Sequence, residues 1–542
     1  MPQRSQPDMP TPVFGGPLSP AAKTFLILLV GACGMASLLA LLPAAGHDQM
    51  WLLYAARLVL HGAPLYGPQV FETNPPLIIW LSMLPEALSD VTHLPDTALG
   101  KLFVAALELG VGALCLRLLR LTHFKLTPPA LYGLAFVFVT AFAVMPARDF
   151  GQRDHFLILF VVPYVFAAAV RAEGTPLPAW LGCLTGSLAL LGVVLKPHQI
   201  LVPIAIEFAL LAMRHANPSR PPLARLIFRP EILAMFASGI IFLVALHHFA
   251  PFYFSVITPL ARDTYWAYGK LTLPQLLDES LQLHLLALLD FALVFSLGWR
   301  NVPAITRLLL VAGAASTLAF YLQSTGWYYQ QLPALSFFSL ALAFLILELA
   351  RQKHMLLPRW TPAAAAGLTL FALALTTYFM GYPFTAERSF PIDQPDPTFF
   401  ANLAPGTPVM TISPTIDDTI MPIFKFHLTL GQRYPAFLMI PALLRSEDPQ
   451  GEHLRHIIPP IRLAELDRIQ HADMVEDLLR WHPQLLLVER CQDPTVNCQV
   501  LEDRRDNLLN YFLRDPAFAQ LFASYHFLRT SGRYDAYTLT HQ

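Results

Sequence analysis

The chain has 542 residues, of which 55% are hydrophobic and 13% charged, and its formal net charge at pH 7 is −1. Soluble domains carry about 25% charged residues. The low charge content and the repeated apolar runs of about 20 residues therefore predict a polytopic membrane protein. A net charge so close to zero argues against a nucleic-acid partner.

The first membrane helix follows a polar, proline-rich N-terminal tail, residues 1–21. The first apolar run is long enough to span a bilayer, so we expect it to stay in the protein and not to be removed as a signal peptide. Residues 22–381 are expected to form a membrane domain of about eleven helices. The predicted spans are 22–43, 97–119, 128–146, 155–172, 179–196, 199–214, 231–250, 276–297, 303–323, 331–350 and 360–381. Segment 76–89 is shorter and contains Pro85, so we interpret it as an interfacial or re-entrant helix.

Basic residues in the short loops predict the orientation. If the helices are assigned correctly, four loops rich in Lys and Arg lie on one side of the membrane, which is then the cytoplasmic side together with the N-terminus. An odd number of helices places residues 382–542 on the outer side. The loop residues are Arg117, Arg120, Lys125, Arg214, Arg220, Arg225, Arg229, Arg300, Arg307, Arg351, Lys353 and Arg359.

The C-terminal 160 residues or so have frequent charges and shorter apolar runs. Segments 407–413 and 483–490 are typical of buried strands, 463–481 and 499–514 of amphipathic helices, and 526–540 of a hairpin. We predict a small extracytoplasmic (periplasmic) α/β domain. Cys491 and Cys498 flank a short polar loop there and could form a disulfide in an oxidising compartment, or could remain two free thiols.

The first outer loop, residues 44–96, carries more polar chemistry than a simple connection needs. Asp48 lies beside His47, Arg57 lies in a short amphipathic helix, and Glu72 precedes an Asn-Pro-Pro sequence. We interpret this loop as part of an active site at the membrane surface. The other predicted outer loops add Asp149, Arg153, Asp154, Lys196, His198, Tyr328 and Tyr329.

The arrangement of these residues resembles the GT-C superfamily of membrane glycosyltransferases. The resemblance rests on Asp48, Ala56, Gly62, Tyr66 and the sequence Asn74-Pro75-Pro76-Leu77, on GQRDH at 151–155, on Lys196-Pro197, and on the aromatic residues at 327–329. Within that superfamily the chain is most similar to the family 39 protein O-mannosyltransferases and the lipid A aminoarabinose transferases. It departs from their frequent Asp-Glu at the first acid, since Gln49 follows Asp48.

The resemblance implies an inverting glycosyltransferase that uses a polyprenyl-phosphate sugar at the outer face of the membrane. No Asn-x-Ser/Thr glycosylation sequence is present, which favours a bacterial protein and hence a bacterial cytoplasmic membrane. An acceptor hydroxyl needs a general base, and we assign this role to Asp48. Asp154 is expected to be a second catalytic residue. The departing phosphate needs cations, for which the candidates are Lys196, His198, Arg153 and Arg57. Asp149, Glu72, Tyr328 and Tyr329 are expected to contact substrate. The acceptor could be an envelope glycan, a lipid or a protein.

Each candidate also has a structural explanation. Asp48 could be the N-cap of a helix over 49–61, and the two loop aspartates could pair with neighbouring arginines. Lys196 could extend toward the membrane interface, Arg57 could be an interfacial anchor, and the aromatic run could belong to an interfacial belt. At the level of function, the alternatives are a transporter or flippase for a lipid-linked glycan, or a non-catalytic scaffold.

A metal is not required by these residues. Asp48, Glu72, Asp149 and Asp154 could together bind a divalent cation through oxygen ligands. Since Lys196 and Arg153 could neutralise the phosphate instead, we expect no metal and no other cofactor.

Overall fold

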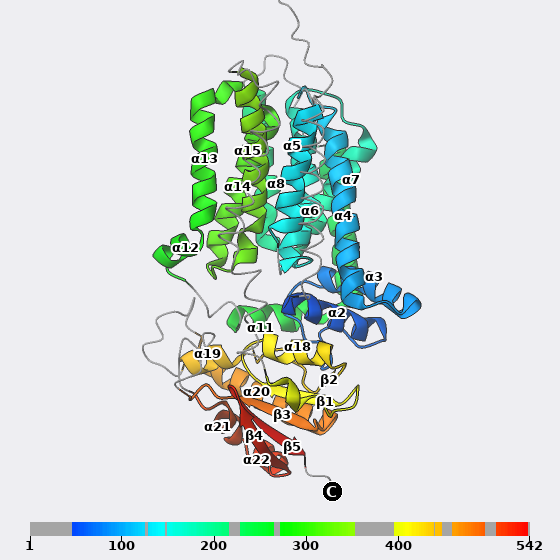
Figure 1. Cartoon of the computed structure of the whole chain (residues 1–542), viewed down its shortest axis with the longest axis vertical. Coiled ribbons are helices and arrows are strands. Elements are labelled where there is room, and N and C mark those ends of the chain that lie inside the picture. Colours follow the sequence, from blue (N-terminus) through cyan, green and yellow to red (C-terminus); the bar gives the residue numbers. More distant parts are fainter. Residues whose placement is uncertain are drawn as a thin grey trace, which may run out of the picture.

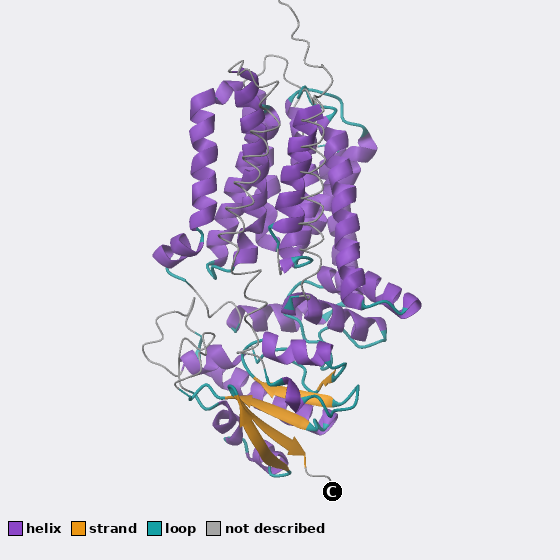
Figure 2. Ribbon diagram, viewed as in Figure 1, coloured by secondary structure: helices purple, strands orange, loops and turns teal. Residues whose placement is uncertain are grey.

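The structure is a computed structural model of the whole chain. It describes residues 46–124, 128–146, 149–215, 228–264, 271–352, 395–437, 439–446, 458–493 and 506–539. A bundle of long helices makes up one part, and a mixed α/β region lies at one end of that bundle (Figures 1 and 2).

The bundle is built from the apolar segments that the sequence predicts. Its helices are α4 (Asp96–Leu119), α5 (Pro128–Val139) with a π-helical continuation (Thr140–Val144), α6 (Arg153–Ala172), α7 (Ala179–Leu195), α8 (Leu201–His215), α10 (Pro230–Phe249), α13 (Leu281–Leu297), α14 (Ala304–Gln323) and α15 (Leu332–Gln352). Among the described helices, five could each cross a membrane by length and composition, or six if a bent pair counts as one span. Predicted spans 22–43 and 360–381 lie outside the described residues, so the number eleven stays a prediction.

The predicted span 276–297 is not one straight helix. It consists of α12 (Leu273–Glu279) and α13, which meet at an angle of 75°. Ser280 at the junction is buried and donates its hydroxyl to the Leu276 carbonyl at 2.5 Å. The break lies at the end of the bundle nearest the α/β region (Figure 1), whereas transporters break their helices near the midplane.

Helix α6 forms the centre of the bundle. It is buried along nearly its whole length and packs against α4, α7, α8, α14 and α15. Helices α10 and α13 lie at the periphery and expose large apolar side chains, such as Phe236, Ile240 and Phe295. A helix that exposes this much apolar surface needs lipid around it.

Four short helices lie at the end of the bundle that faces the α/β region: α2 (His47–Leu60), α3 (Leu77–Thr92), α11 (Thr258–Asp263) and α12. Helix α3 matches the predicted interfacial segment, although it continues through Pro85 for almost two further turns. Gly62 (φ +97°) follows α2 and allows the sharp turn at its C-terminus. The chain then turns at Tyr66, whose hydroxyl donates to the Asn74 carbonyl at 2.7 Å, before α3 begins.

The α/β region contains a five-stranded sheet in the order β2-β1-β3-β5-β4. Strands β1 (Pro408–Ile412), β2 (Thr429–Leu430) and β3 (Leu485–Glu489) are parallel, while β5 (Tyr534–Leu539) runs antiparallel to both β3 and β4 (Tyr525–Ser531). The accompanying helices are α18 (Asp417–Lys425), α19 (Met439–Ser446), α20 (Pro460–Trp481), α21 (Leu508–Leu513) and α22 (Pro516–Phe522).

The sequence patterns located most of these elements. The two predicted buried strands are β1 and β3, the helix predicted over 463–481 is α20, and the predicted hairpin is β4–β5. The helix predicted over 499–514 is present only as α21 in the described residues. Strand β2 was missed because two residues carry no periodic signal.

Direct contacts join the α/β region to the first outer loop. The backbone amide of Leu430 donates to the hydroxyl of Tyr54 on α2 at 3.0 Å, and α18 packs against α2. Arg462 on α20 forms an ion pair with Asp263 on α11 at 2.9 Å. Residues 46–96, α11 and the α/β region therefore lie at the same end of the bundle. The ends of α4 and α15 that carry Arg117 and Arg351 lie at the opposite end.

A buried carboxyl group ends β3. Glu489 is 1% exposed, Ser413 donates a hydrogen bond to its Oε2 at 2.7 Å, and the Arg533 Nε lies 3.6 Å from its Oε1. Burial raises the pKa of Glu489 from 4.5 to about 7, although Arg533 lowers it in part. Glu489 therefore keeps its proton in the folded protein at pH values where the unfolded chain has lost it.

We therefore expect the free energy of unfolding to fall as the pH rises from about 4.5 to about 7, and Glu489→Gln to remove on the order of 2 kcal/mol of this dependence. The measurement is denaturant unfolding of the purified protein at about pH 5 and about pH 7.5. Glu279→Gln, at an exposed position, is the matched control. Equal pH dependence in the wild type and in Glu489→Gln would contradict the prediction.

Candidate functional site

Asp48 lies in the first turn of α2, at the end of the bundle nearest the α/β region. Gly46 is the N-cap of this helix, so the alternative of Asp48 as N-cap is wrong. The His47 Nε2 lies 3.3 Å from the Asp48 Oδ1. Burial alone would raise the pKa of Asp48, but the charge and hydrogen bond of His47 and the charges of Arg153 and Lys196 lower it to about 2. Asp48 is therefore an ionised carboxylate beside two cations.

The loop before α6 brings the second acid into the same place. Gly151 adopts φ +83°, and a Cβ there would lie only 2.9 Å from the Gln49 Nε2, so this turn requires glycine. The turn lets α6 start at Arg153 beside the first turn of α2. Asp154 is fully buried in the first turn of α6, where its Oδ2 lies 3.1 Å from the Lys196 Nζ.

Lys196 connects α7 to a short 3₁₀ helix (Pro197–Ile200). Its Nζ lies 5.2 Å from the centre of the Tyr329 ring, in addition to the contact with Asp154. His198 is within electrostatic reach of both Lys196 and Arg153. Lys196, His198 and Arg153 therefore lie close together, although they come from segments about 40 residues apart.

We call Asp48, Arg153, Asp154 and Lys196 the acid–cation cluster. Three chain segments contribute to it, and their charges balance at two positive and two negative. The lysine of the predicted fifth helix and the first acid thus lie at the same end of the bundle, as the sequence predicted. The cluster holds a carboxylate and two cations within reach of one another, which can bind an anion and accept a proton.

Several buried polar atoms around this cluster have no hydrogen-bond partner in the part of the chain that the structure describes. They belong to side chains that adjoin the cluster in sequence: Gln49 Oε1, Gln152 Oε1, His198 Nε2 and both amide atoms of Gln199. Buried polar atoms are nearly always paired in native proteins, so a group of unpaired ones marks a place where water or a ligand can supply the partners. The sequence analysis did not single out Gln49, Gln152 and Gln199. The only sequence feature that points to them is their position next to the predicted acid and cations.

His155 supports the loop that carries Asp154. Its Nδ1 accepts a hydrogen bond from the Gly151 amide at 3.0 Å, and its Nε2 lies 3.2 Å from the Glu108 Oε1. His155 is fully buried and fixes the turn that positions the start of α6.

The other predicted substrate residues lie around the cluster in supporting contacts. The Asp149 Oδ1 accepts a hydrogen bond from the side-chain amide of Gln152 at 2.7 Å, and the Tyr328 hydroxyl donates to the Met145 carbonyl at 2.9 Å. Glu72 accepts from the Trp51 indole at 2.6 Å and from the Asn74 amide at 2.9 Å. The contacts of Glu72 hold the first outer loop in shape, and those of Asp149 and Tyr328 hold the loops before α6 and α15. Substrate contact by these residues stays a prediction.

Arg57 is placed differently from the other predicted cations. Its guanidinium pairs with Glu86 at 2.9 Å and with Asp96, and lies 5.8 Å from the centre of the Phe424 ring. It therefore joins α2, α3, α4 and α18. These contacts explain its position structurally, and a phosphate contact by Arg57 stays a prediction.

In the described residues, no group of three or more His, Cys, Asp or Glu side chains is arranged to bind a metal ion. Of the four acids considered for such a site, Asp154 pairs with Lys196 and Glu72 with Trp51. The absence of a metal cofactor stays a prediction. Cys491 is disulfide-bonded, but Cys498 lies outside the described residues, so the predicted pairing of the two also stays a prediction.

No protein-family model matches the sequence, and no curated protein matches it. The structure is similar to the crystal structure of ArnT from Cupriavidus metallidurans bound to undecaprenyl phosphate. The TM-score is 0.55 at 13% sequence identity, and the match covers 95% of this chain and 98% of that one. A likeness at this identity concerns the fold alone. The similarity confirms the predicted GT-C-like fold over nearly the whole chain.

Proposed function

We propose that this GT-C-fold protein is an inverting glycosyltransferase that moves a sugar from a polyprenyl-phosphate donor to an acceptor hydroxyl. The observation that carries the proposal is the acid–cation cluster with its surrounding unpaired polar atoms. A similar fold that binds undecaprenyl phosphate in ArnT supports the choice of donor.

In the proposed reaction, the acceptor oxygen bonds to the anomeric carbon of the donor while the bond from that carbon to the phosphate oxygen breaks. The bonding electrons leave with the phosphate. Lys196 and Arg153 stabilise the negative charge that develops there. Asp48 takes the proton of the acceptor hydroxyl.

The electrostatics of the cluster favour donor binding before proton transfer. A carboxylate whose pKa is about 2 is a weak base, and the charges of Lys196 and Arg153 help to keep the pKa of Asp48 low. A donor phosphate that pairs with these two cations offsets their charge, so the pKa of Asp48 rises and its carboxylate becomes a stronger base. We therefore expect the base to be activated only when the donor is bound.

We place the cluster at the outer face of the cytoplasmic membrane. The helix ends that carry Arg117 and Arg351 lie at the opposite end of the bundle, and basic helix ends face the cytoplasm. With this orientation, the α/β region is extracytoplasmic, where the disulfide of Cys491 is chemically stable.

The test uses the purified full-length protein in lipid nanodiscs with undecaprenyl-phosphate sugars and envelope lipids or glycans. Mass spectrometry is expected to find free undecaprenyl phosphate together with a glycosylated acceptor. Mass spectrometry of envelope glycans and lipids from a deletion strain would identify the natural product. A flippase would instead move the donor across the bilayer intact, and that result would overturn the proposal.

A further inference from the structure

A cavity of about 940 Å³ lies between the bundle and the α/β region. Its walls come from the first outer loop (Tyr66 to Phe71), from residues 255–263, and from Arg433, Tyr434 and one face of α20. We call it the interface cavity. Sites for small molecules commonly measure about 300–1,000 Å³, so this one is large enough for more than a single monosaccharide.

The interface cavity lies at the same end of the bundle as the acid–cation cluster and does not include it. Tyr66 lines the cavity, and its ring centre lies 5.6 Å from that of Tyr253. Tyr253 is in turn within electrostatic reach of Arg153. A ligand in the cavity would therefore lie at the same end of the bundle as the proposed site of transfer, on the side of the α/β region.

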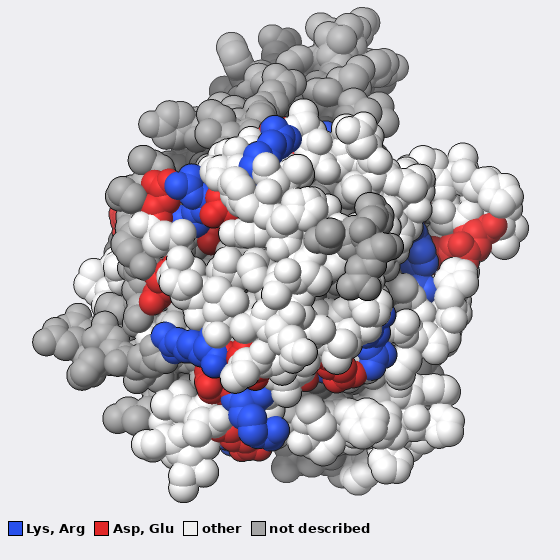
Figure 3. Space-filling model, turned by 90° about the horizontal axis from the view of Figure 1, so that it is seen from below, with Lys and Arg blue, Asp and Glu red and all other residues white. Residues whose placement is uncertain are grey.

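The charges of the cavity wall cancel. Its basic side chains are Arg262, Arg433 and Arg462, and its acidic ones are Asp263, Glu465 and Asp473. Each arginine is paired: Arg262 and Arg462 with Asp263 at 2.8 and 2.9 Å, Arg462 also with Glu465 at 2.8 Å, and Arg433 with Asp473 at 2.8 Å. Figure 3 shows the same mixture of basic and acidic side chains over this end of the molecule.

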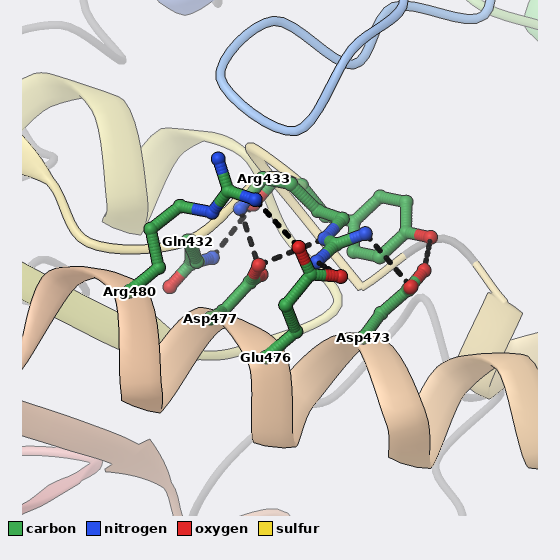
Figure 4. Close-up of polar contacts among 7 residues, drawn as sticks. Gln432, Arg433, Asp473, Glu476, Asp477 and Arg480 are labelled. Carbon is green, nitrogen blue, oxygen red and sulfur yellow. Dashed lines mark hydrogen bonds and ion pairs between the residues drawn. The ribbon is translucent and has the colours of Figure 1, made fainter.

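Arg433 is the most strongly neutralised of the three. Its guanidinium also pairs with Glu476 and Asp477, each at 2.8 Å, so three carboxylates from α20 surround it (Figure 4). The neighbouring Tyr434 hydroxyl donates to Asp473. A phosphate or carboxylate ligand would have to compete with these acids for every arginine of the wall, and it would be repelled by the acids themselves.

We propose that the interface cavity binds the acceptor of the transfer reaction, and that the acceptor presents an uncharged saccharide there. This inference rests on the proposed function and names its substrate class. A sugar hydroxyl both donates and accepts hydrogen bonds, so it fits between paired guanidinium and carboxylate groups without disturbing their charge balance. The apolar parts of the wall, which include Phe71, Val256, Leu260 and Ile469, can pack against the C–H faces of the sugar rings.

The experiment measures binding to the full-length protein in nanodiscs, without donor, by native mass spectrometry. The probes are neutral hexose and N-acetylhexosamine oligosaccharides, the same lengths carrying uronic acid or phosphate groups, and lipid-linked forms of the neutral ones. We expect neutral oligosaccharides to bind at least about tenfold more tightly than charged ones. Binding of the lipid-linked form alone would also support the proposal and would identify a glycolipid as the source.

Ser255→Trp fills the cavity from an exposed position on its wall, and Phe254→Trp changes an exposed neighbour outside the wall. We expect Ser255→Trp to weaken oligosaccharide binding about tenfold and Phe254→Trp to leave it unchanged. Binding of undecaprenyl phosphate should be the same in both variants.

Two results would overturn the inference: charged oligosaccharides that bind as tightly as neutral ones, or undiminished binding in Ser255→Trp. Failure to bind any oligosaccharide, free or lipid-linked, would overturn it as well. In each of these cases intact donor binding would leave the proposed function standing. If the wild-type protein does not bind the donor at all, the proposed function itself is refuted.

Discussion

Replacing Asp48 with asparagine is expected to lower the rate of sugar transfer by about 100- to 10,000-fold while the protein remains folded and binds its donor. Asparagine has nearly the same shape as aspartate and can still accept a hydrogen bond from His47, which lies 3.3 Å away in the wild type. It cannot take a proton from the acceptor hydroxyl. The measurement is the release of undecaprenyl phosphate in the presence of acceptor.

A second aspartate–histidine pair in the same loop provides the control. The Asp90 Oδ2 lies 3.4 Å from the His61 Nε2, and both side chains are exposed. Asp90→Asn is therefore expected to leave transfer unchanged. If Asp48→Asn transfers sugar at the wild-type rate, Asp48 is not the general base.

The same assignment predicts the pH dependence of the wild type. Because the pKa of Asp48 in the empty site is about 2, its carboxylate is already ionised at every pH above about 4. We expect kcat/KM, which reports the free enzyme, to show no loss from Asp48 between about pH 7 and about pH 4. A fall of kcat/KM with an apparent pKa in that interval, absent in Asp48→Asn, would contradict the depressed pKa.

Replacing Lys196 with methionine is expected to abolish donor binding and also to destabilise the protein. Asp154 is fully buried and its Oδ2 lies 3.1 Å from the Lys196 Nζ, so the single variant leaves a buried carboxylate without its cation. Breaking such a pair by removing one partner costs about 3–5 kcal/mol. Thermal unfolding measures the stability, and native mass spectrometry with undecaprenyl phosphate measures the binding.

The double variant Lys196→Met/Asp154→Asn separates the two effects. With both charges removed, we expect most of the lost stability to return, since a neutral side chain at 154 no longer needs a cation. Donor binding should stay lost because the phosphate has lost one of its two cations. If the double variant binds undecaprenyl phosphate as the wild type does, Lys196 serves only to neutralise Asp154.

The helices and strands were predictable where a local pattern is strong. The apolar runs located α4, α6, α10, α14 and α15, and alternation or continuous burial located β1 and β3. The same patterns did not predict the bend between α12 and α13. A bend in a helix depends on one junction, here Ser280, and on how the residues around it pack. Pro85 lies inside the interfacial segment predicted over 76–89, and α3 continues through it to Thr92.

Arg57 shows why partners could not be assigned from the sequence. Its carboxylates, Glu86 and Asp96, follow 29 and 39 residues later, and no local pattern links them to it. The interface cavity was equally invisible, because its walls come from three parts of the chain that only folding brings together.

The sequence by itself determined that this protein is a helical membrane protein and where its polar motifs lie, because apolar length and residue type act locally. The GT-C-like fold was implied by the resemblance of those motifs to a known superfamily. The tertiary structure decided that Asp48, Arg153, Asp154 and Lys196 share one site and that Arg57 does not. It also decided that the wall of the neighbouring cavity is electrically neutral. Such facts depend on distances between groups far apart in the chain, and charges interact strongly only when packing removes the water between them.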